Sequence, residues 1–281
     1  MIERIGILEQ PRIPASPAMA REIESWLDER GVASWIAEPW EDNPALDEQL
    51  ANSQLLIVLG GDGSTLRAAR LSVPYGVPLF GVNMGRVGFL SEATPEDWPD
   101  RLQKILIGDY WTERRLLING NLWRQDELID SFVALNEIVL GRGSQARVIR
   151  LSLYVDGDLV TTYIADALIV ATPTGSTAYA LAAGGPLLPP QLQNIVVVPV
   201  AAHLSLNRSL VLHEEAEIDI HIEMDHEAFL TADGQNSVKL EDGDRVLIVK
   251  YDKPCLFARV DDAGYFYRRL MQRLGFSWPH L

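Results

Sequence analysis

The sequence predicts a doubly wound parallel α/β domain at residues 1–113, a mostly β domain at residues 114–262, and a tail at residues 263–281. Three observations predict this organisation. Strands alternate with helices in the first third of the chain. After about Leu116, helical periodicity fades and short alternating apolar runs appear between turn signals. The final stretch, YFYRRLMQRLGF, is again helical in pattern, and a lone helix has no core of its own, so we expect it to pack back on the N-terminal domain.

The elements of the first domain follow from local signals. Three helices begin where Ser, Asn or Thr precedes a proline. Leu55–Gly60, LLIVLG, is apolar on both faces, as expected of a central parallel strand that helices cover on both sides. The expected strands are residues 4–8, 33–39, 55–60 and 77–83, and the expected helices with proline starts are residues 16–30, 43–51 and 94–109.

The second domain carries strand and turn signals. Leu151–Ile164 is typical of a hairpin, with Asp156-Gly157 as its turn. Ala216–Met224 alternates between apolar and polar residues, which indicates a strand with one buried face. Ser237–Tyr251 looks like a second hairpin.

The composition argues against several classes of protein. Acids outnumber bases by 39 to 24, for a net charge of −15, and no basic tail or patch is visible, so nucleic acid is not an expected partner. The best candidate for a membrane span, Ile195–Ala202, has only eight residues where about 20 are needed, so no membrane partner is expected. A single cysteine, Cys255, excludes a disulfide framework. The N-terminus shows no secretion signal, and we therefore expect a cytoplasmic protein.

A glycine cluster that contains one carboxylate follows the central strand. In GGDG, Gly60 to Gly63, the glycines allow close approach to a ligand, and the N–H groups that open the next helix suit phosphate oxygens. Asp62 would repel phosphates unless it binds a metal or accepts a proton from an attacking hydroxyl. From these residues alone, an ordinary turn in which Asp62 caps the helix is an equally good interpretation. Arg67, one helical turn later, either reaches a phosphate or faces solvent.

Three further polar segments stand out. NMGRVGFL, Asn83 to Leu90, follows the next strand, and is either part of the same site or a loop with packing glycines. Asn136-Glu137 interrupts an apolar strand, and either binds ribose hydroxyls or marks a strand end that faces solvent. TPTGSTAY, Thr172 to Tyr179, crowds small hydroxyl residues between the strand Ala167–Ala171 and an Ala-rich helix. This last segment favours a polar ligand, with Tyr179 available to stack on a base.

Taken in order, GGDGSTLRAAR, GVNMGRVGFL, NE, TPTGSTAYALAAGGP and DGQ resemble the NAD kinases over nearly the whole chain. GGDG alone is shared with phosphofructokinases and with diacylglycerol and sphingosine kinases, whereas TPTGSTAY together with the Asn-Glu pair is more discriminating. The resemblance implies an N-terminal α/β domain, a C-terminal β-rich domain and an active site in the crevice between them. It implies transfer of a phosphoryl group from ATP or polyphosphate to the 2′-hydroxyl of the adenosine ribose of NAD, giving NADP. It further implies a divalent metal cation such as Mg²⁺ as cofactor, and a homodimer or homotetramer.

The resemblance also carries roles onto matching positions. Asp62 would accept the proton, with Gly63 beside the substrate and Arg67 near phosphates. The metal ligands stay unassigned. The residues expected to bind the dinucleotide are Asn136, Glu137, Arg147, Asp166, Thr177, Ala178, Tyr179, Ala180, Leu181, Ala182 and Gln235.

Four positions depart from the family pattern. Ser64 stands where Thr is usual, Ala167 replaces a common Gly, Ser209 replaces a common Pro, and Ile164 stands where a polar or basic residue is common. None of them removes a residue assigned to chemistry. Two other interpretations stay open: another GGDG kinase, acting on a sugar phosphate or a lipid, and a non-catalytic NAD(H)-binding sensor.

Overall fold

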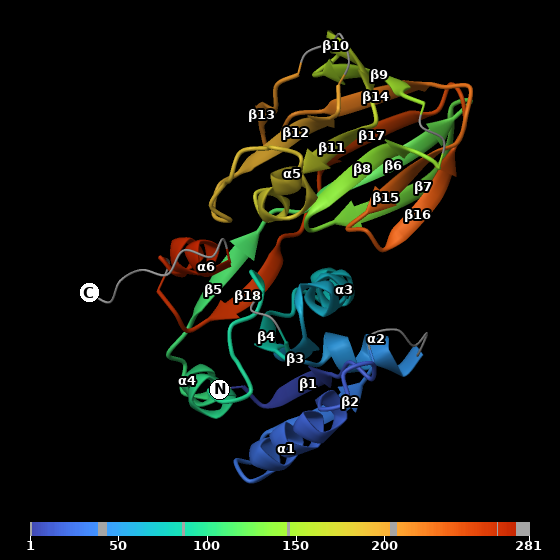
Figure 1. Ribbon diagram of the computed structural model, residues 1–281. Helices are drawn as coiled ribbons and strands as arrows, with labels where there is room; N and C mark the ends of the chain where they lie inside the picture. Colours follow the sequence, from blue (N-terminus) through green and yellow to red (C-terminus); the bar gives the residue numbers. More distant parts are fainter. Residues whose placement is uncertain are drawn as a thin grey trace. The chain divides into compact units, whose positions relative to one another are not determined.

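The chain forms two compact units, one made of Met1–Arg114 with Pro254–Leu281, and the other of Arg115–Lys253. The first unit therefore combines two separate parts of the chain, and the red elements β18 and α6 belong to it together with the blue and cyan ones (Figure 1). Within the described residues, no helix is both long and apolar enough to cross a membrane. The computed structural model describes residues 2–38, 44–85, 88–144, 147–202, 207–262 and 264–273.

One six-stranded sheet organises the first unit, in the order β2-β1-β3-β4-β18-β5. The pairs β1-β2, β1-β3, β3-β4 and β4-β18 are parallel, as the alternation of strands and helices predicts. Every residue of β3 is buried, which confirms its central place. The strands are β1 (Arg4–Leu8), β2 (Ala33–Ala37), β3 (Leu55–Gly60), β4 (Leu79–Asn83), β5 (Trp111–Arg115) and β18 (Cys255–Arg259).

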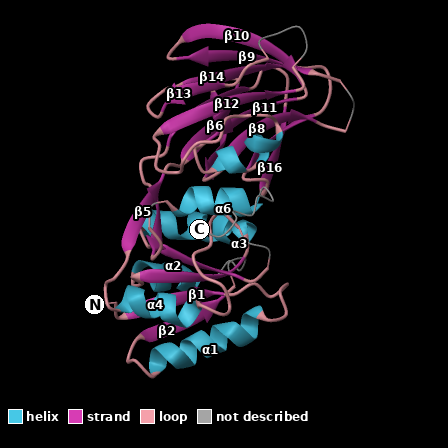
Figure 2. Cartoon of the chain, turned by 60° about the vertical axis from the view of Figure 1, so that its left-hand side comes forward, coloured by secondary structure: helices cyan, strands magenta, loops and turns pink. Residues whose placement is uncertain are grey.

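Helices pack on this sheet as the sequence predicts (Figure 2). Apolar side chains of α1 and α4 join those of β1, β3 and β4 in one buried cluster, while α3 packs on β3 and β4. A proline stands in the first turn of α1, in accord with its Ser-Pro start. The helices are α1 (Ser16–Asp28), α2 (Pro44–Ala51), α3 (Asp62–Ser72), α4 (Trp98–Leu106) and α6 (Tyr265–Arg273), with a 3₁₀ turn at Val73–Tyr75.

The C-terminal helix α6 packs on the first unit, which confirms the expectation from the helical tail. The Tyr265 hydroxyl lies 2.9 Å from each carboxylate oxygen of Glu113 on β5. The chain returns to the first unit earlier than the expected domain boundary at residue 262. Because β18 pairs with β4 through Phe257 and Leu79 and buries its apolar residues there, the chain returns to the first unit already at Pro254.

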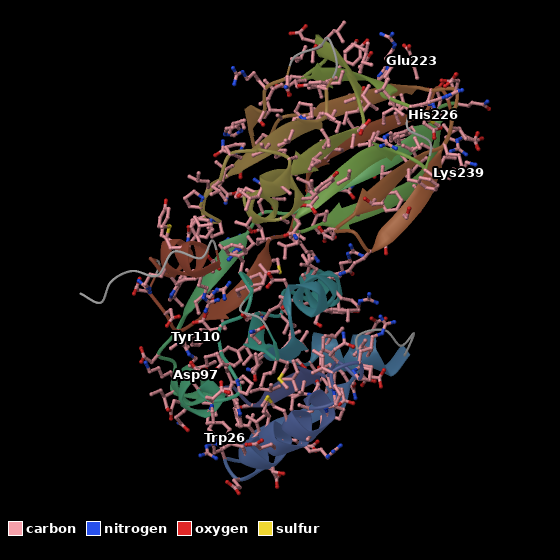
Figure 3. All side chains as sticks on the ribbon, viewed as in Figure 1. Trp26, Asp97, Tyr110, Glu223, His226 and Lys239 are labelled. Atoms are coloured by element: carbon pink, nitrogen blue, oxygen red, sulfur yellow. The ribbon has the colours of Figure 1, made fainter. Side chains whose placement is uncertain are left out.

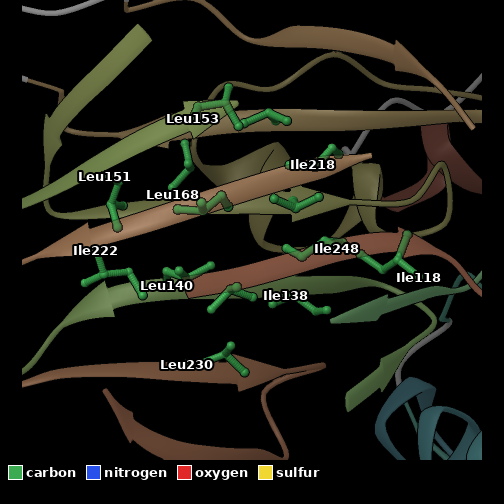
Figure 4. Close-up of a cluster of buried hydrophobic side chains, with 14 of the residues drawn as sticks. Ile118, Ile138, Leu140, Leu151, Leu153, Leu168, Ile218, Ile222, Leu230 and Ile248 are labelled. Atoms are coloured by element: carbon green, nitrogen blue, oxygen red, sulfur yellow. The ribbon is translucent and has the colours of Figure 1, made fainter. Parts of the chain in front are cut away.

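Two six-stranded antiparallel sheets build the second unit, in the orders β10-β9-β14-β17-β6-β7 and β13-β12-β11-β8-β15-β16. Their apolar faces share one core, in which side chains of β14 and β17 meet those of β8 and β11 (Figure 4). The strands are β6 (Ile118–Arg124), β7 (Glu127–Ala134), β8 (Glu137–Arg142), β9 (Ile149–Val155), β10 (Asp158–Ala165), β11 (Ala167–Ala171), β12 (Asn194–Val200), β13 (Leu210–His213), β14 (Ile218–Glu223), β15 (Ala228–Ala232), β16 (Asn236–Leu240) and β17 (Arg245–Lys250).

One of the two hairpins predicted for this unit forms, and the other does not. β9 and β10 form the predicted hairpin, with Asp156 and Gly157 both at positive φ. Ser237–Tyr251 does not form one: β16 pairs with β15 in one sheet, and β17 pairs with β14 and β6 in the other. The turn that contains Gly243, also at positive φ, carries the chain between the sheets, because each strand buries its apolar face in the shared core.

Candidate functional site

The GGDG segment places Asp62 at the start of α3, directly after β3. Gly60 has a φ of 158°, and Gly61 is the N-cap of the helix in extended conformation with no side-chain cap bond. The Asp62 carboxylate instead reaches the loop after β4, where Oδ2 accepts the Phe89 N–H at 3.0 Å and Oδ1 accepts the Leu90 N–H at 3.1 Å. These bonds join the first two glycine segments found in the sequence.

Gly88 permits this contact. A Cβ atom at position 88 would overlap the Asp62 Oδ1, whereas one at Gly85 in the same loop would meet no heavy atom within 4 Å. Position 88 therefore requires glycine, because the backbone there closely approaches the Asp62 carboxylate. Arg86 and Val87, which belong to the NMGRVGFL segment, lie outside the described residues.

The first turns of α3 present open space and positive charge. Gly63 is exposed, and a Cβ built there meets nothing within 4 Å. Arg67 is partly buried, and burial together with the nearby Arg70 and Arg12 lowers its pKa. Guanidinium groups that repel one another favour a bound anion beside Arg67.

In the second unit, Asn136 lies in the turn between β7 and β8, and Glu137 is the first residue of β8, so the pair does not stand within one continuous strand. The Asp233 carboxylate holds this turn, because it accepts the backbone N–H groups of Leu135 at 3.1 Å, Asn136 at 2.7 Å and Glu137 at 3.2 Å. In return, the Asp233 N–H donates to the Glu137 carbonyl at 2.9 Å. Of the two interpretations of this pair, the one in which it faces solvent is excluded for Glu137, whose exposed fraction is 7%.

Glu137 is a buried carboxyl group with spare hydrogen-bonding capacity. Burial and the neighbouring Asp233 raise its pKa to about 8, although the backbone N–H of Tyr179 lowers it. Its Oε2 is buried without a hydrogen-bond partner among the described residues. Buried polar atoms are normally paired, so this oxygen suits a ligand that brings its own donor.

The TPTGST loop packs directly on the Asn136–Glu137 turn. The Thr172 hydroxyl donates to the Leu135 carbonyl at 2.5 Å, and the Thr172 N–H donates to the Asn136 carbonyl at 2.9 Å. A Cβ at Gly175 would overlap that same carbonyl, which explains the glycine between the hydroxyl residues. The hydroxyls themselves are partly used within the loop, since Thr177 Oγ1 donates to the Thr174 carbonyl at 3.0 Å.

A short helix completes this end of the second unit. The predicted Ala-rich helix is one turn long, α5 (Tyr179–Ala182), because Gly184 and Gly185 follow at once. Ala180 is buried, whereas the Tyr179 ring is 44% exposed and free to stack on a flat ligand. Gln235 lies in the turn next to Asp233, so it belongs to the same end of the strands as Glu137.

Two predicted residues lie at the opposite end of these strands within the unit. β8 and β11 are paired antiparallel, with Glu137 opposite Ala171 and Gly141 opposite Ala167, so Asp166 is roughly 15 Å along the strand from Glu137. Asp166 pairs with Arg142 at 3.0 Å. The exposed Arg147 pairs with Asp225 at 3.5 Å, and its carbonyl lies 2.9 Å from His226 Nε2, near the end of β14 (Figure 3).

The described residues contain no group of three or more His, Cys, Asp or Glu side chains that could hold a metal ion. They therefore supply no ready-made metal cage. Mg²⁺ commonly needs only one or two protein carboxylates when substrate phosphates supply the other oxygens, so the donor set is compatible with an ion that arrives with a nucleotide.

Two residues that organise these groups have no distinctive signal in the sequence. Asp233 belongs to the DGQ segment, and its positive φ of 52° and its three backbone donors show in the structure that it anchors the neighbouring strand start. Gly88 was one of several loop glycines, and no pattern separates it from Gly85.

Comparison with known proteins gives consistent matches. Residues 41–110 match the model of the ATP-NAD kinase N-terminal domain, and residues 135–260 match that of the C-terminal domain. An NAD kinase of Chloroflexus aurantiacus is 40% identical over 276 residues, which covers 98% of this chain and 99% of that one. One of Dehalococcoides mccartyi is 36% identical over 275 residues, covering 98% and 96%.

Solved structures match as well. The structure of an NAD kinase from Archaeoglobus fulgidus in complex with ATP has a TM-score of 0.77 and 29% identity, and the match covers 95% of this chain and 98% of that one. Yeast NADH kinase complexed with NADH has a TM-score of 0.88, with coverage of 100% and 89%. At 24% identity, the second match shows the fold alone.

Proposed function

The chain belongs to the NAD kinase family, and on that premise we propose that it transfers a phosphoryl group from ATP or polyphosphate to the 2′-hydroxyl of the adenosine ribose of NAD. The placement of Asp62 is the structural observation that supports this proposal. Its carboxylate stands on an open glycine turn and is oriented by two backbone N–H groups. The product is NADP.

Asp62 accepts the proton of the 2′-hydroxyl as the ribose oxygen attacks the terminal phosphorus of the donor. The new O–P bond forms while the bond to the leaving phosphate oxygen breaks, and the electron pair stays on the leaving group. Positioning of the hydroxyl by a fixed carboxylate is the contribution of the protein to this step. A bound divalent cation would offset phosphate charge.

The other predicted residues bind and orient the substrates in this proposal. Gly63 leaves room for the substrate, and Arg67 offers positive charge to phosphates. Glu137 accepts a hydrogen bond from a ribose hydroxyl through its unpaired oxygen, and Tyr179 stacks on the adenine. A homodimer or homotetramer remains a prediction from the family resemblance, and a cytoplasmic location remains a prediction from the sequence.

Formation of NADP tests the proposal. The purified protein is incubated with NAD, Mg²⁺ and either ATP or polyphosphate, and NADP is read with an NADP-specific dehydrogenase. We expect NADP with at least one of the two donors. No NADP with either donor, combined with phosphorylation of fructose 6-phosphate or of a lipid, would establish the competing kinase assignment.

Replacing Glu137 with glutamine is expected to weaken NAD binding and to stabilise the unliganded protein at alkaline pH. At pH 8.5, above the pKa of about 8, the Glu137 carboxylate is charged, and a hydrogen bond to a charged group is worth roughly 1.5–3 kcal/mol, so the dissociation constant of NAD at this pH should rise by about 10- to 150-fold. Because the pKa of Glu137 is raised from 4.5 to about 8, the folded protein holds a proton that the unfolded chain releases. The free energy of unfolding of the wild type should therefore fall as the pH rises through this window, and Glu137→Gln should lack that part of the fall.

Calorimetric titration with NAD and urea unfolding at pH 5.5 and pH 8.5 measure both effects. Glu223→Gln on the exposed end of β14 is a matched control, expected to change neither quantity by much. A Glu137→Gln variant that binds NAD normally but unfolds earlier at both pH values would show that the residue serves the fold.

A further inference from the structure

Arg259 at the end of β18 is an arginine with an exposed fraction of 0%. Its guanidinium carbon lies 4.8 Å from the centre of the Phe257 ring and 4.9 Å from that of Tyr265. Removing a charge from water costs several kcal/mol, and a buried ion pair is often no more stabilising than an apolar replacement. Stability alone is therefore a weak reason for this residue, and its contacts show what else it does.

Two carboxylates and two carbonyls surround the guanidinium. Nε donates to Glu113 Oε2 at 2.9 Å, and Nη1 lies 3.1 Å from Glu92 Oε2. The same Nη1 lies 3.2 Å from the Leu90 carbonyl and 3.3 Å from the Ser91 carbonyl. Arg259 thus holds the backbone of the loop that follows β4, in addition to its ion pairs.

One residue of that loop joins the arginine to the carboxylate of Asp62. The Leu90 carbonyl accepts from Arg259, and the Leu90 N–H donates to Asp62 Oδ1. Phe89, immediately before it, donates to Asp62 Oδ2. A shift of the Leu90 backbone therefore changes the direction in which the carboxylate is held.

Glu92 fixes the far end of the same loop. Its Oε1 accepts the N–H of Val260 at 2.7 Å and that of Asp261 at 2.9 Å, and its own N–H donates to the Gly81 carbonyl at 2.7 Å. Arg269 on α6 also donates to the Ser91 carbonyl. The loop is therefore held in place by Val260, Asp261 and Arg269, which all follow the point where the chain returns from the second unit.

We propose that Arg259 is a positioning residue for Asp62, acting through the backbone of Leu90. The proposal rests on the proposed function, because it concerns the orientation of the proton acceptor. Misplacement of a catalytic group by about 1 Å can cost on the order of 100-fold in rate, whereas NAD affinity need not change. A residue that only stabilised the fold would lower the amount of folded protein and not the turnover of each folded molecule.

Arg259→Lys keeps the charge but loses the planar fork that reaches the carbonyls and Glu113 together. We expect kcat to fall by about 10- to 100-fold, with the dissociation constant of NAD within about twofold of the wild type. Turnover is normalised to NAD-binding sites counted by titration, so that misfolded protein is not counted. The control is Arg101→Lys, since Arg101 pairs with Glu92, Asp97 and Asp261 in the same network, and it should lose stability and keep kcat.

A double-mutant cycle separates positioning from other effects. If Arg259 acts through Asp62, Arg259→Lys should cost less than about threefold further in the Asp62→Asn background. Full additivity, or a normal kcat in the single variant, overturns the proposal while wild-type NADP formation keeps the proposed function. If Arg259→Lys does not fold, Glu92→Gln is measured in its place, and a normal kcat there overturns the proposal equally. An inactive wild type would refute the proposed function itself.

Discussion

Replacing Asp62 with asparagine is expected to lower kcat by about 100- to 10,000-fold, with little change in NAD affinity. Asparagine keeps the shape of the side chain and removes the proton acceptor, and its amide nitrogen also gives up one of the two hydrogen bonds that the carboxylate accepts from Phe89 and Leu90. Since the carboxylate is held by the N–H groups of Phe89 and Leu90 and not by its own helix, the replacement tests chemistry and not capping. Turnover per NAD-binding site and NAD affinity are measured on the same preparation.

Two other outcomes would assign Asp62 a different role. If it mainly organises the metal, the variant should need a much higher Mg²⁺ concentration, and excess Mg²⁺ should restore part of the rate. If it only holds the loop after β4, turnover per folded molecule should hardly change, because Asn keeps one of the two oxygens that accept the Phe89 and Leu90 N–H groups. Near-normal turnover at ordinary Mg²⁺ concentration would rule out the catalytic assignment.

Gly88→Ala is expected to have the second largest effect, a loss of about 100-fold in kcat. The added Cβ would overlap Asp62 Oδ1, so either the loop or the carboxylate must move. Gly85→Ala is the matched control, because it adds the same methyl group three residues earlier, where no heavy atom lies within 4 Å. Steady-state kinetics with saturating NAD and donor measure both variants.

Equal kcat values for the two alanine variants would contradict the close-contact explanation. A Gly88→Ala protein with normal kcat and raised KM for NAD would mean that the loop serves binding and not the orientation of Asp62. Circular dichroism and urea unfolding confirm that both variants are folded before the rates are compared.

Much of the fold could be predicted because its signals are local. LLIVLG predicted a central strand, and β3 is fully buried. The Asp156-Gly157 turn predicted a hairpin that the positive φ angles of both residues confirm. The hairpin predicted at Ser237–Tyr251 was wrong because that prediction also used only a local signal. The turn exists, but the sheet that each strand joins depends on the shared core of the unit and not on the turn.

The residues of the candidate site also divide into those with a local signal in the sequence and those without one. Asp62, Glu137 and Tyr179 were singled out because each is an unusual residue within its own segment. Arg259 and Asp233 could not be found in this way, since an arginine that ends an apolar run and an aspartate in a turn are ordinary features. Their roles come from partners far away in the sequence, such as Leu90 and Leu135.

Phosphorus NMR of the product identifies the oxygen that receives the phosphoryl group. The purified protein is incubated with NAD, Mg²⁺ and the donor that supports turnover, and the dinucleotide product is isolated. We expect one new phosphate monoester resonance that coincides with the 2′-phosphate of authentic NADP. A monoester on the 3′-hydroxyl, or phosphate transferred only to a sugar phosphate or lipid acceptor, would contradict it.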